Sequence, residues 1–205
     1  MKPAVLYRTS QATETRLEIL RVAMDVASAE GLEGLSIGRL AAEMQMSKTG
    51  IFSHFGSKQE LQLATIEAAR GVFTERVVTP SLKSPRGIPR LNAMLSSWLE
   101  YVEKIVFRGG CFFAAASAEF DSRPGPVRDQ IASLTRAWLT AIEDEINFAK
   151  FANQIQTSVK APQLAFELHA YVQEANWAFK LFDEKSAFRF ARRAIADRIR
   201  DLSAN

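Results

Sequence analysis

The sequence predicts an all-α protein with an N-terminal three-helix helix-turn-helix domain over residues 1–60 and a C-terminal helical domain over residues 81–205. Apolar residues recur at intervals of three and four along most of the chain, which is the period of one helical face. Serines that suit helix starts stand at positions 36, 47 and 57. We see no segment with the strict alternation of polar and apolar residues that indicates a half-buried strand.

The first helix is expected over residues 14–30, because apolar side chains line one of its faces and Gly31 can end it as a C-cap. Ser36 can cap a short second helix, because its hydroxyl accepts from an otherwise unpaired backbone N–H. The apolar stripe of that helix runs through residues 37–44, and residues 45–46 fit a tight turn.

The next two helix starts are marked in the same way. Ser47 can cap a helix in which Ile51 and Phe55 face inward at a spacing of i, i+4. Ser57 and Glu60 match a capping box, in which the serine and the glutamate each satisfy an N–H group at the helix end. We expect the helix that follows, about residues 58–79, to connect the two domains.

Two short helices around a tight turn, the second amphipathic, form a device that places side chains in the major groove of DNA. Residues 47–59 contain Lys48, His54 and Lys58 and no acidic residue. Residues 1–60 as a whole hold seven Lys or Arg and seven Asp or Glu, so DNA binding would depend on where the charges lie. The segment therefore indicates binding to double-stranded DNA.

Residues 13–61 resemble the DNA-binding domain of TetR-family transcriptional repressors, with the matching runs at residues 37–42 and 46–61. Residues 109–113 and 121–127 also look like one subgroup of that family. The resemblance implies a ligand-responsive repressor. Such a protein binds a palindromic operator as a homodimer and is released by a small apolar or aromatic effector.

We expect base reading from Lys48 and Thr49 and phosphate contact from His54 and Lys58. The full expected DNA-binding set is Ser36, Ser47, Lys48, Thr49, Gly50, Phe52, Ser53, His54 and Lys58.

Phe52 departs from the family pattern, in which a tyrosine at this position commonly reaches a phosphate through its hydroxyl. A phenylalanine can instead contact a thymine methyl group. Helical geometry leaves two alternatives. If Phe52 is buried, the exposed face centres on Thr49, Gly50 and Ser53. If it is exposed, the face consists of Lys48, Thr49, Phe52 and Ser53, and the resemblance favours this second arrangement.

The C-terminal section follows a Pro- and Gly-containing linker over residues 81–89. Its expected helices are residues 89–107, 111–120, 127–151, 163–182 and 185–202. Large rings are spread over these helices, and they suit either a packed core or a small-molecule pocket, since such pockets are mostly apolar with a few polar groups. The resemblance favours a pocket, with candidate residues Trp98, Tyr101, Phe112, Phe113, Glu119, Trp138, His169 and Trp177.

The last two helices carry one apolar stripe each, and either stripe suits a core or a contact with a second copy. In the family these helices pair with their twin as a four-helix dimer interface, a two-fold arrangement that suits a palindromic operator. The candidate interface residues are Leu164, Leu168, Tyr171, Phe188, Ala191, Ile195 and Ile199.

Several classes of protein find little support in the composition. No apolar run reaches the ~18 residues of a membrane helix, and the N-terminus is unlike a signal peptide. The one cysteine, Cys111, suits a reducing cytoplasm and is interpreted as a buried, inert thiol rather than a redox sensor.

An enzyme is not expected, because the sequence shows no metal-spaced cluster and no phosphate-binding Gly loop. No cofactor or metal is expected either. The alternative that remains is a helical protein-interaction module without DNA binding, because residues 1–60 carry no net charge and Phe52 lacks the hydroxyl.

Overall fold

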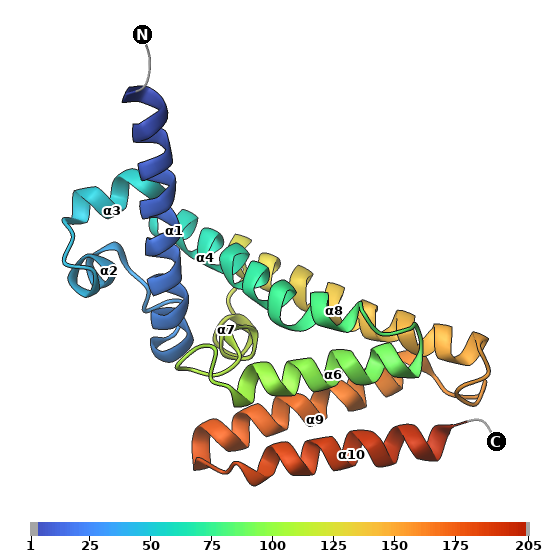
Figure 1. Cartoon of the computed structure of the whole chain (residues 1–205). Helices are drawn as coiled ribbons and strands as arrows, with labels where there is room; N and C mark the ends of the chain where they lie inside the picture. The colour runs from blue at the N-terminus through green and yellow to red at the C-terminus, as the bar shows by residue number, and fades with distance from the viewer. Residues whose placement is uncertain (1–3, 204–205) are drawn as a thin grey trace. The chain divides into compact units, whose positions relative to one another are not determined.

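The computed structural model describes the backbone of residues 4–203 and the side chains of residues 13–203. Its described part is all-α, as predicted (Figure 1). The elements are α1 (Ala4–Glu30), α2 (Ile37–Glu43), α3 (Lys48–Phe55), α4 (Lys58–Phe73), the π-helix η1 (Thr74–Val78), α5 (Thr79–Ser81), α6 (Ile88–Glu103), α7 (Phe112–Phe120), α8 (Pro126–Phe151), α9 (Ala161–Phe182) and α10 (Ser186–Leu202).

Helix boundaries agree with the predicted ones to within two residues, with three differences. α6 ends at Glu103 rather than at residue 107. α1 begins at Ala4 rather than at residue 14, because the chain from Ala4 to Glu30 contains neither Gly nor Pro. The predicted single helix over residues 58–79 is instead α4 followed by η1 and α5, so Pro80 lies inside a helical segment. It does so at the start of α5, where its missing N–H costs little.

The chain divides into two compact units that do not follow its order. Unit 1 consists of Met1–Arg70 and Phe107–Ile131, and unit 2 consists of Gly71–Val106 and Ala132–Asn205. The segment around α7 therefore groups with the N-terminal helices. Both α4 and α8 contribute residues to both units.

In unit 1 the helix-turn-helix packs against α1 through fully buried side chains, among them Ile19, Leu40, Ile51 and Leu61. Gln45 makes the tight turn between α2 and α3 with a φ of 53°. α7 packs against α1. Gly109, just before α7, lies so close to α1 that a Cβ there would stand 1.6 Å from the carbonyl oxygen of Ser28, and only glycine fits.

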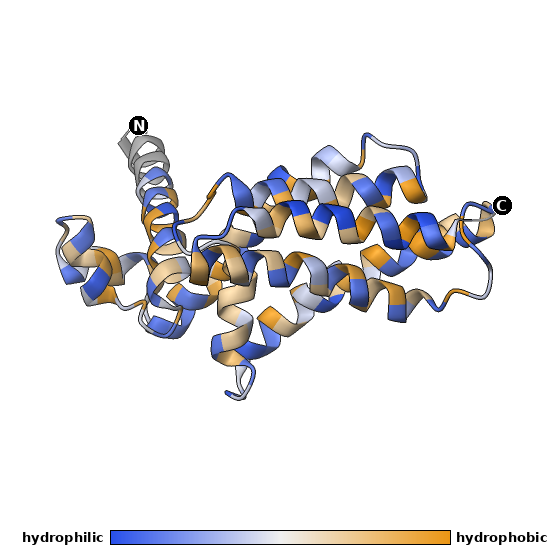
Figure 2. Ribbon diagram, turned by 90° about the horizontal axis from the view of Figure 1, so that it is seen from below, coloured by the Kyte–Doolittle hydropathy of each residue, from blue (hydrophilic) through white to orange (hydrophobic). Residues whose placement is uncertain are grey.

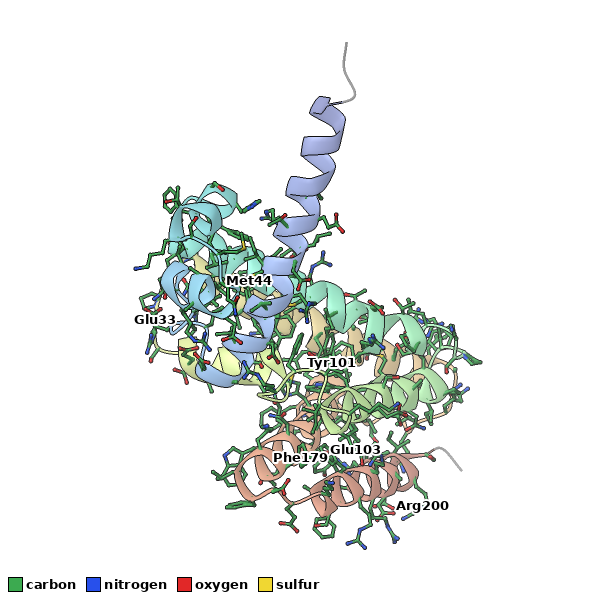
Figure 3. The ribbon with its side chains drawn as sticks, turned by 60° about the vertical axis from the view of Figure 1, so that its left-hand side comes forward. Glu33, Met44, Tyr101, Glu103, Phe179 and Arg200 are labelled. Carbon is green, nitrogen blue, oxygen red and sulfur yellow. The ribbon has the colours of Figure 1, made fainter. Side chains whose placement is uncertain are left out.

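In unit 2, α9 packs against both α6 and α10, and Figure 1 shows the three helices side by side. The rings of Phe179 on α9 and Phe188 on α10 lie 5.0 Å apart between centroids, and Phe179 is labelled in Figure 3. An ion pair between Arg192 and Glu103 joins α10 to α6. This packing decides which face of α9 and α10 remains exposed.

Candidate functional site

The orientation of α3 follows from its cap and its two buried residues. The Ser47 hydroxyl accepts from the Gly50 N–H at 3.0 Å, and Ile51 and Phe55 point into unit 1. Phe52 is 50% exposed, which decides between the two alternatives left by the sequence. The outward side of α3, called here the reading face, therefore consists of Lys48, Thr49, Phe52 and Ser53.

The serines near the reading face are partly engaged in the protein itself. Ser36 accepts from the Arg39 N–H at 3.1 Å, and Ser53 donates to the Gly50 carbonyl at 2.8 Å. Because a hydroxyl has one donor and two acceptor positions, Ser36 and Ser47 keep a proton to donate and Ser53 keeps lone pairs. The first two can therefore donate to a phosphate oxygen.

Gly50 and His54 are half-buried members of the expected DNA-binding set. A Cβ at Gly50 would lie 3.2 Å from the Ser47 hydroxyl oxygen, so a side chain there would press on the cap. The His54 ring lies 6.3 Å from the Phe55 ring. Both residues are therefore only partly accessible on α3.

The two lysines of the segment differ in their surroundings. Lys48 is exposed and has no ion-pair partner within the described part of the chain. The Lys58 ammonium lies 2.7 Å from a carboxylate oxygen of Glu33, and this hydrogen bond lowers the pKa of Glu33. Lys58 must therefore share or leave Glu33 in order to contact a phosphate, whereas Lys48 is already available.

The acids of unit 1 are largely neutralised by neighbouring cations. Glu18 pairs with Arg21 at 2.7 Å, and Glu30 and Glu43 both pair with Arg39 at 2.7 Å. These ion pairs reduce the repulsion between the acidic side chains of this unit and the phosphates of DNA.

Arg16 is a further cation that the sequence analysis did not identify. Its guanidinium lies 4.9 Å from the centre of the Phe55 ring, although the two residues are far apart in sequence. The contact places a positive charge beside the C-terminal end of α3. No local pattern could have identified it, because only the packing of α1 on α3 brings the two residues together.

Glu119, expected in the ligand pocket, instead binds the loop between α1 and α2. Its two carboxylate oxygens accept from the backbone N–H groups of Leu32 at 2.6 Å and Glu33 at 3.0 Å. Figure 3 labels Glu33, whose own carboxylate also accepts from Lys58. The α7 segment thereby holds the loop that leads into the helix-turn-helix.

Two more contacts fix the same segment to α1. Arg108 donates its backbone N–H to Asp25 at 3.0 Å and forms an ion pair with the same carboxylate at 2.5 Å. The Gly109 N–H donates to the Ser28 hydroxyl at 3.0 Å. Together with the Glu119 contacts, these bonds form what we call the α1–α7 latch.

Unit 2 brings together four of the predicted pocket residues around one unpredicted ring. The ring of Phe73 makes edge contacts with Trp138 at 5.0 Å, with Tyr101 at 5.6 Å and with Trp98 at 6.2 Å between centroids. His169 lies 5.1 Å from Trp98. We call these five residues the aromatic cluster, and Tyr101 is labelled in Figure 3.

The aromatic cluster contains buried polar atoms without protein partners. Within the described residues, the indole N–H groups of Trp98 and Trp138 have no hydrogen-bond partner, and neither has the hydroxyl of Thr135, which precedes Trp138 by three residues on α8. A buried polar group left unpaired costs about 1–3 kcal/mol. Burial also lowers the pKa of His169, so its ring is neutral at pH 7.

Three further predicted pocket residues make ring contacts of their own. Phe112 and Phe113 contact each other in unit 1, at 5.5 Å between ring centroids. Trp177 is half-exposed and contacts Phe182. Cys111 is buried at the start of α7, in line with the interpretation of an inert thiol.

The predicted dimer stripe belongs to the interior of the single chain, which is a correction to the sequence analysis. Tyr171 is half-buried, and the other six residues, Leu164, Leu168, Phe188, Ala191, Ile195 and Ile199, are buried. They pack α9 and α10 against each other and against α6, so they are not available to a second copy.

The outward sides of the same helices carry a second apolar surface. It consists of Phe166, Trp177, Leu181, Phe182 and Phe190, each 50–67% exposed, and we call it the outer apolar face. Apolar residues appear in orange along the helices in Figure 2. Phe166, Trp177 and Leu181 fall on one side of α9 at a spacing of i, i+11, i+15.

The fold and the reading face define the class of helix-turn-helix DNA-binding proteins. Residues 19–65 match the family described as bacterial regulatory proteins, tetR family, and residues 87–195 match the tetracyclin repressor-like C-terminal domain. The chain therefore belongs to the TetR family of transcriptional regulators and contains its DNA-binding domain.

Solved structures of that family share the fold. A TetR regulator from Chloroflexus aurantiacus is 22% identical, with a TM-score of 0.87 over 95% of this chain and 98% of that one. A TetR-family regulator from Cytophaga hutchinsonii is 18% identical, with a TM-score of 0.80 over 95% and 98%. AibR, solved with isovaleryl coenzyme A and operator DNA, is 23% identical, with a TM-score of 0.70 over 91% and 97%.

No curated protein matches the chain significantly. Within the described residues, no helix is long and apolar enough to span a membrane.

Proposed function

We propose that the protein is a ligand-responsive repressor that binds a palindromic operator as a homodimer and is released by a small apolar or aromatic effector. The observation that carries this proposal is the reading face. It is a short capped helix with exposed Lys48, Thr49, Phe52 and Ser53 and no acidic residue.

DNA recognition would combine base reading with phosphate contact. Lys48 can donate to guanine, Thr49 can contact a base edge, and the exposed ring of Phe52 can contact a thymine methyl. Ser36, Ser47 and Arg16 supply donors for phosphates around α3. Phosphate contacts fix the register, and the base contacts give the sequence preference.

The dimer interface is proposed at the outer apolar face rather than at the stripe expected from the sequence. Four of its five large apolar side chains lie on α9 and the fifth, Phe190, lies on α10, and each of them is exposed. Exposed apolar patches of this kind mark interaction surfaces. Because a two-fold interface uses the same patch on both copies, it suits an operator with two equivalent half-sites.

Control by an effector is proposed at the aromatic cluster. Phe73 ends α4, whose first residues follow the reading helix, and η1 begins at the next residue. π-helical turns are frequent at functional sites. An effector that displaces the Phe73 ring would therefore act on the connecting helix, with an expected coupling of about 1–3 kcal/mol. AibR was solved with both an acyl coenzyme A and operator DNA, which supports the same two kinds of partner here.

The test begins with selection of genomic fragments that the purified protein retains, followed by fluorescence anisotropy with the recovered site. We expect binding that weakens as the salt concentration rises. Thr49→Ala should change which bases the protein prefers. Ser133→Ala, at an exposed position on α8, serves as the control and should bind as the wild type. If no fragment is retained at low salt, the protein is an interaction module rather than a repressor.

A further inference from the structure

We propose that the effector is an uncharged molecule with a hydrogen-bond acceptor, such as an aromatic ketone, that accepts from the indole N–H groups of Trp98 and Trp138 in the aromatic cluster. This inference rests on the proposed function, and it adds the chemical class of the ligand.

Two indole N–H donors of the cluster are not bonded by any acceptor of the described residues. An indole has one N–H donor and no acceptor, so only an incoming lone pair can satisfy Trp98 and Trp138. Their rings lie 5.7 Å apart between centroids at an interplanar angle of 85°. Thr135 stands three residues before Trp138 on α8, which places its hydroxyl on the same side of that helix. One small acceptor-bearing molecule can therefore engage groups from both α6 and α8.

Other buried polar groups of unit 2 do have partners, which makes the cluster exceptional. The buried carboxylate of Glu145 accepts from Arg86 at 3.0 Å and from the Gly87 N–H at 2.8 Å. The Ser81 hydroxyl donates to the Val78 carbonyl at 2.7 Å. Buried indole N–H groups usually find a partner as well. The exceptions in the described residues therefore point to a partner from outside the chain.

The surroundings favour a ligand without charge. Phe73 and Trp98 are buried rings, and His169 beside Trp98 is neutral because burial lowers its pKa. A carboxylate in such surroundings would lose its hydration without gaining a paired cation. A carbonyl oxygen can accept from the indoles at a smaller desolvation cost.

The experiment uses matched probe pairs that differ in the acceptor alone: 9-fluorenone with fluorene, and benzophenone with diphenylmethane. Binding to the full-length protein is measured by calorimetry. One hydrogen bond between neutral groups is worth about three- to ten-fold in affinity, so each ketone should bind more tightly than its hydrocarbon by at least that factor. Equal binding within both pairs, a preference for the hydrocarbons, or no binding by any probe would overturn the inference.

A second readout uses the protein's own indoles. The protein has three tryptophans, so nitrogen-15 labelling of tryptophan gives three indole N–H signals. Trp98→Phe and Trp138→Phe assign two of them, and the half-exposed Trp177 gives the internal reference. 9-Fluorenone should move the Trp98 and Trp138 protons downfield, as a new hydrogen bond requires, and leave Trp177 unmoved. If fluorene produces the same downfield shifts, or Trp177 alone responds, the inference fails.

Operator binding by the same protein without a probe is measured in parallel. If the operator is bound but neither ketone is preferred, the ligand class is wrong and the DNA-binding function stands. If ketones are preferred but no operator is found, the indole site stands as a binding site and the repressor function fails.

Discussion

The two units treat their buried polar groups differently. In unit 1 the α1–α7 latch pairs both oxygens of Glu119 with backbone N–H groups, and Gln62 donates to the Leu32 carbonyl at 2.9 Å. In unit 2 the aromatic cluster leaves two indole N–H groups without a partner among the described residues. Satisfied networks specify one arrangement, whereas a buried polar group without a partner needs an explanation such as a bound water, ion or ligand. Unit 1 therefore holds its loop through paired groups, and the unpaired indoles of unit 2 are the observation on which we base the proposed ligand site.

The largest effect is expected from the two faces of α9. Leu168→Ala should lower the free energy of unfolding by about 2–5 kcal/mol, because Leu168 is fully buried.

Trp177→Asp should leave the fold intact but yield monomers, because Trp177 belongs to the outer apolar face. A monomer engages one half-site instead of two, so its operator binding should be weaker by ~100-fold or more.

Thermal unfolding measures the stability of the variants, and analytical ultracentrifugation measures whether they are monomers or dimers. Glu174→Gln, at an exposed position of α9, is the control. A Trp177→Asp variant that stays dimeric and binds the operator normally would place the interface elsewhere.

The next effect concerns the latch. Glu119→Ala should destabilise unit 1 by about 2 kcal/mol, because the Leu32 and Glu33 N–H groups lose a charged acceptor. Glu119→Gln keeps one acceptor oxygen and should lose less. Denaturant unfolding measures both variants, and equal stability of the wild type and Glu119→Ala would show that the latch contributes nothing.

Phe73→Leu tests the role of the central ring of the aromatic cluster. Leucine keeps the residue apolar but removes the edge contacts with three rings, which are worth about 0.5–1.5 kcal/mol for each pair. We expect a modest loss of stability together with a weaker effect of the ligand on operator binding. Operator titrations with and without 9-fluorenone measure that coupling, and an unchanged coupling would exclude Phe73 from signal transmission.

The two lysines should differ in their effect on DNA binding. Lys48→Ala should change the base preference at the guanine that Lys48 contacts, and it should lower the slope of log affinity against log salt by about one unit for each phosphate that its charge also neutralises. Lys58→Ala should lower it less, because Lys58 is paired with Glu33 in the free protein. Anisotropy titrations across a salt series give both slopes. A larger change for Lys58→Ala would mean that DNA draws Lys58 away from Glu33.

The smallest effect is a dependence of stability on pH. Ion pairing lowers the pKa of Glu33 in unit 1 through Lys58 and that of Glu167 in unit 2 through Arg198. A lowered carboxyl pKa contributes stability above the ordinary value of 4.5, and this contribution disappears as the pH falls through the lowered pKa. Each partly exposed pair should contribute under about 1 kcal/mol. Arg198→Met should flatten the acid limb of the unfolding curve, and an unchanged limb would show that this pair is inert.

The sequence predicted the helix-turn-helix well because its signals are local. Ser36 and Ser47 cap α2 and α3 as expected. At Ser57 half of the expected capping box forms. The Glu60 N–H donates to the Ser57 hydroxyl, but the Ser57 N–H donates to the Phe55 carbonyl at 2.8 Å instead of to Glu60. The Phe55 carbonyl lies two residues before Ser57, and it accepts the N–H that a complete capping box would give to Glu60.

The sequence could not predict contacts between residues that lie far apart along the chain. Glu119 binds residues 86 and 87 positions away, and no periodicity indicates such a partner. Both sides of α9 carry large apolar residues, so periodicity alone could not tell the inner stripe from the outer apolar face. Phe73 was not identified as part of the cluster, because a phenylalanine on a connecting helix is indistinguishable from ordinary core.

The most direct measurement is a footprint of the wild-type protein on a genomic fragment that it retains. We expect protection of two inverted half-sites whose centres lie about one helical turn, ~34–36 Å, apart on the same face of the DNA. The reading face of one copy would contact each half-site. Protection of a single unpaired half-site, or protection that persists unchanged when Lys48 and Thr49 are both replaced by alanine, would contradict this expectation.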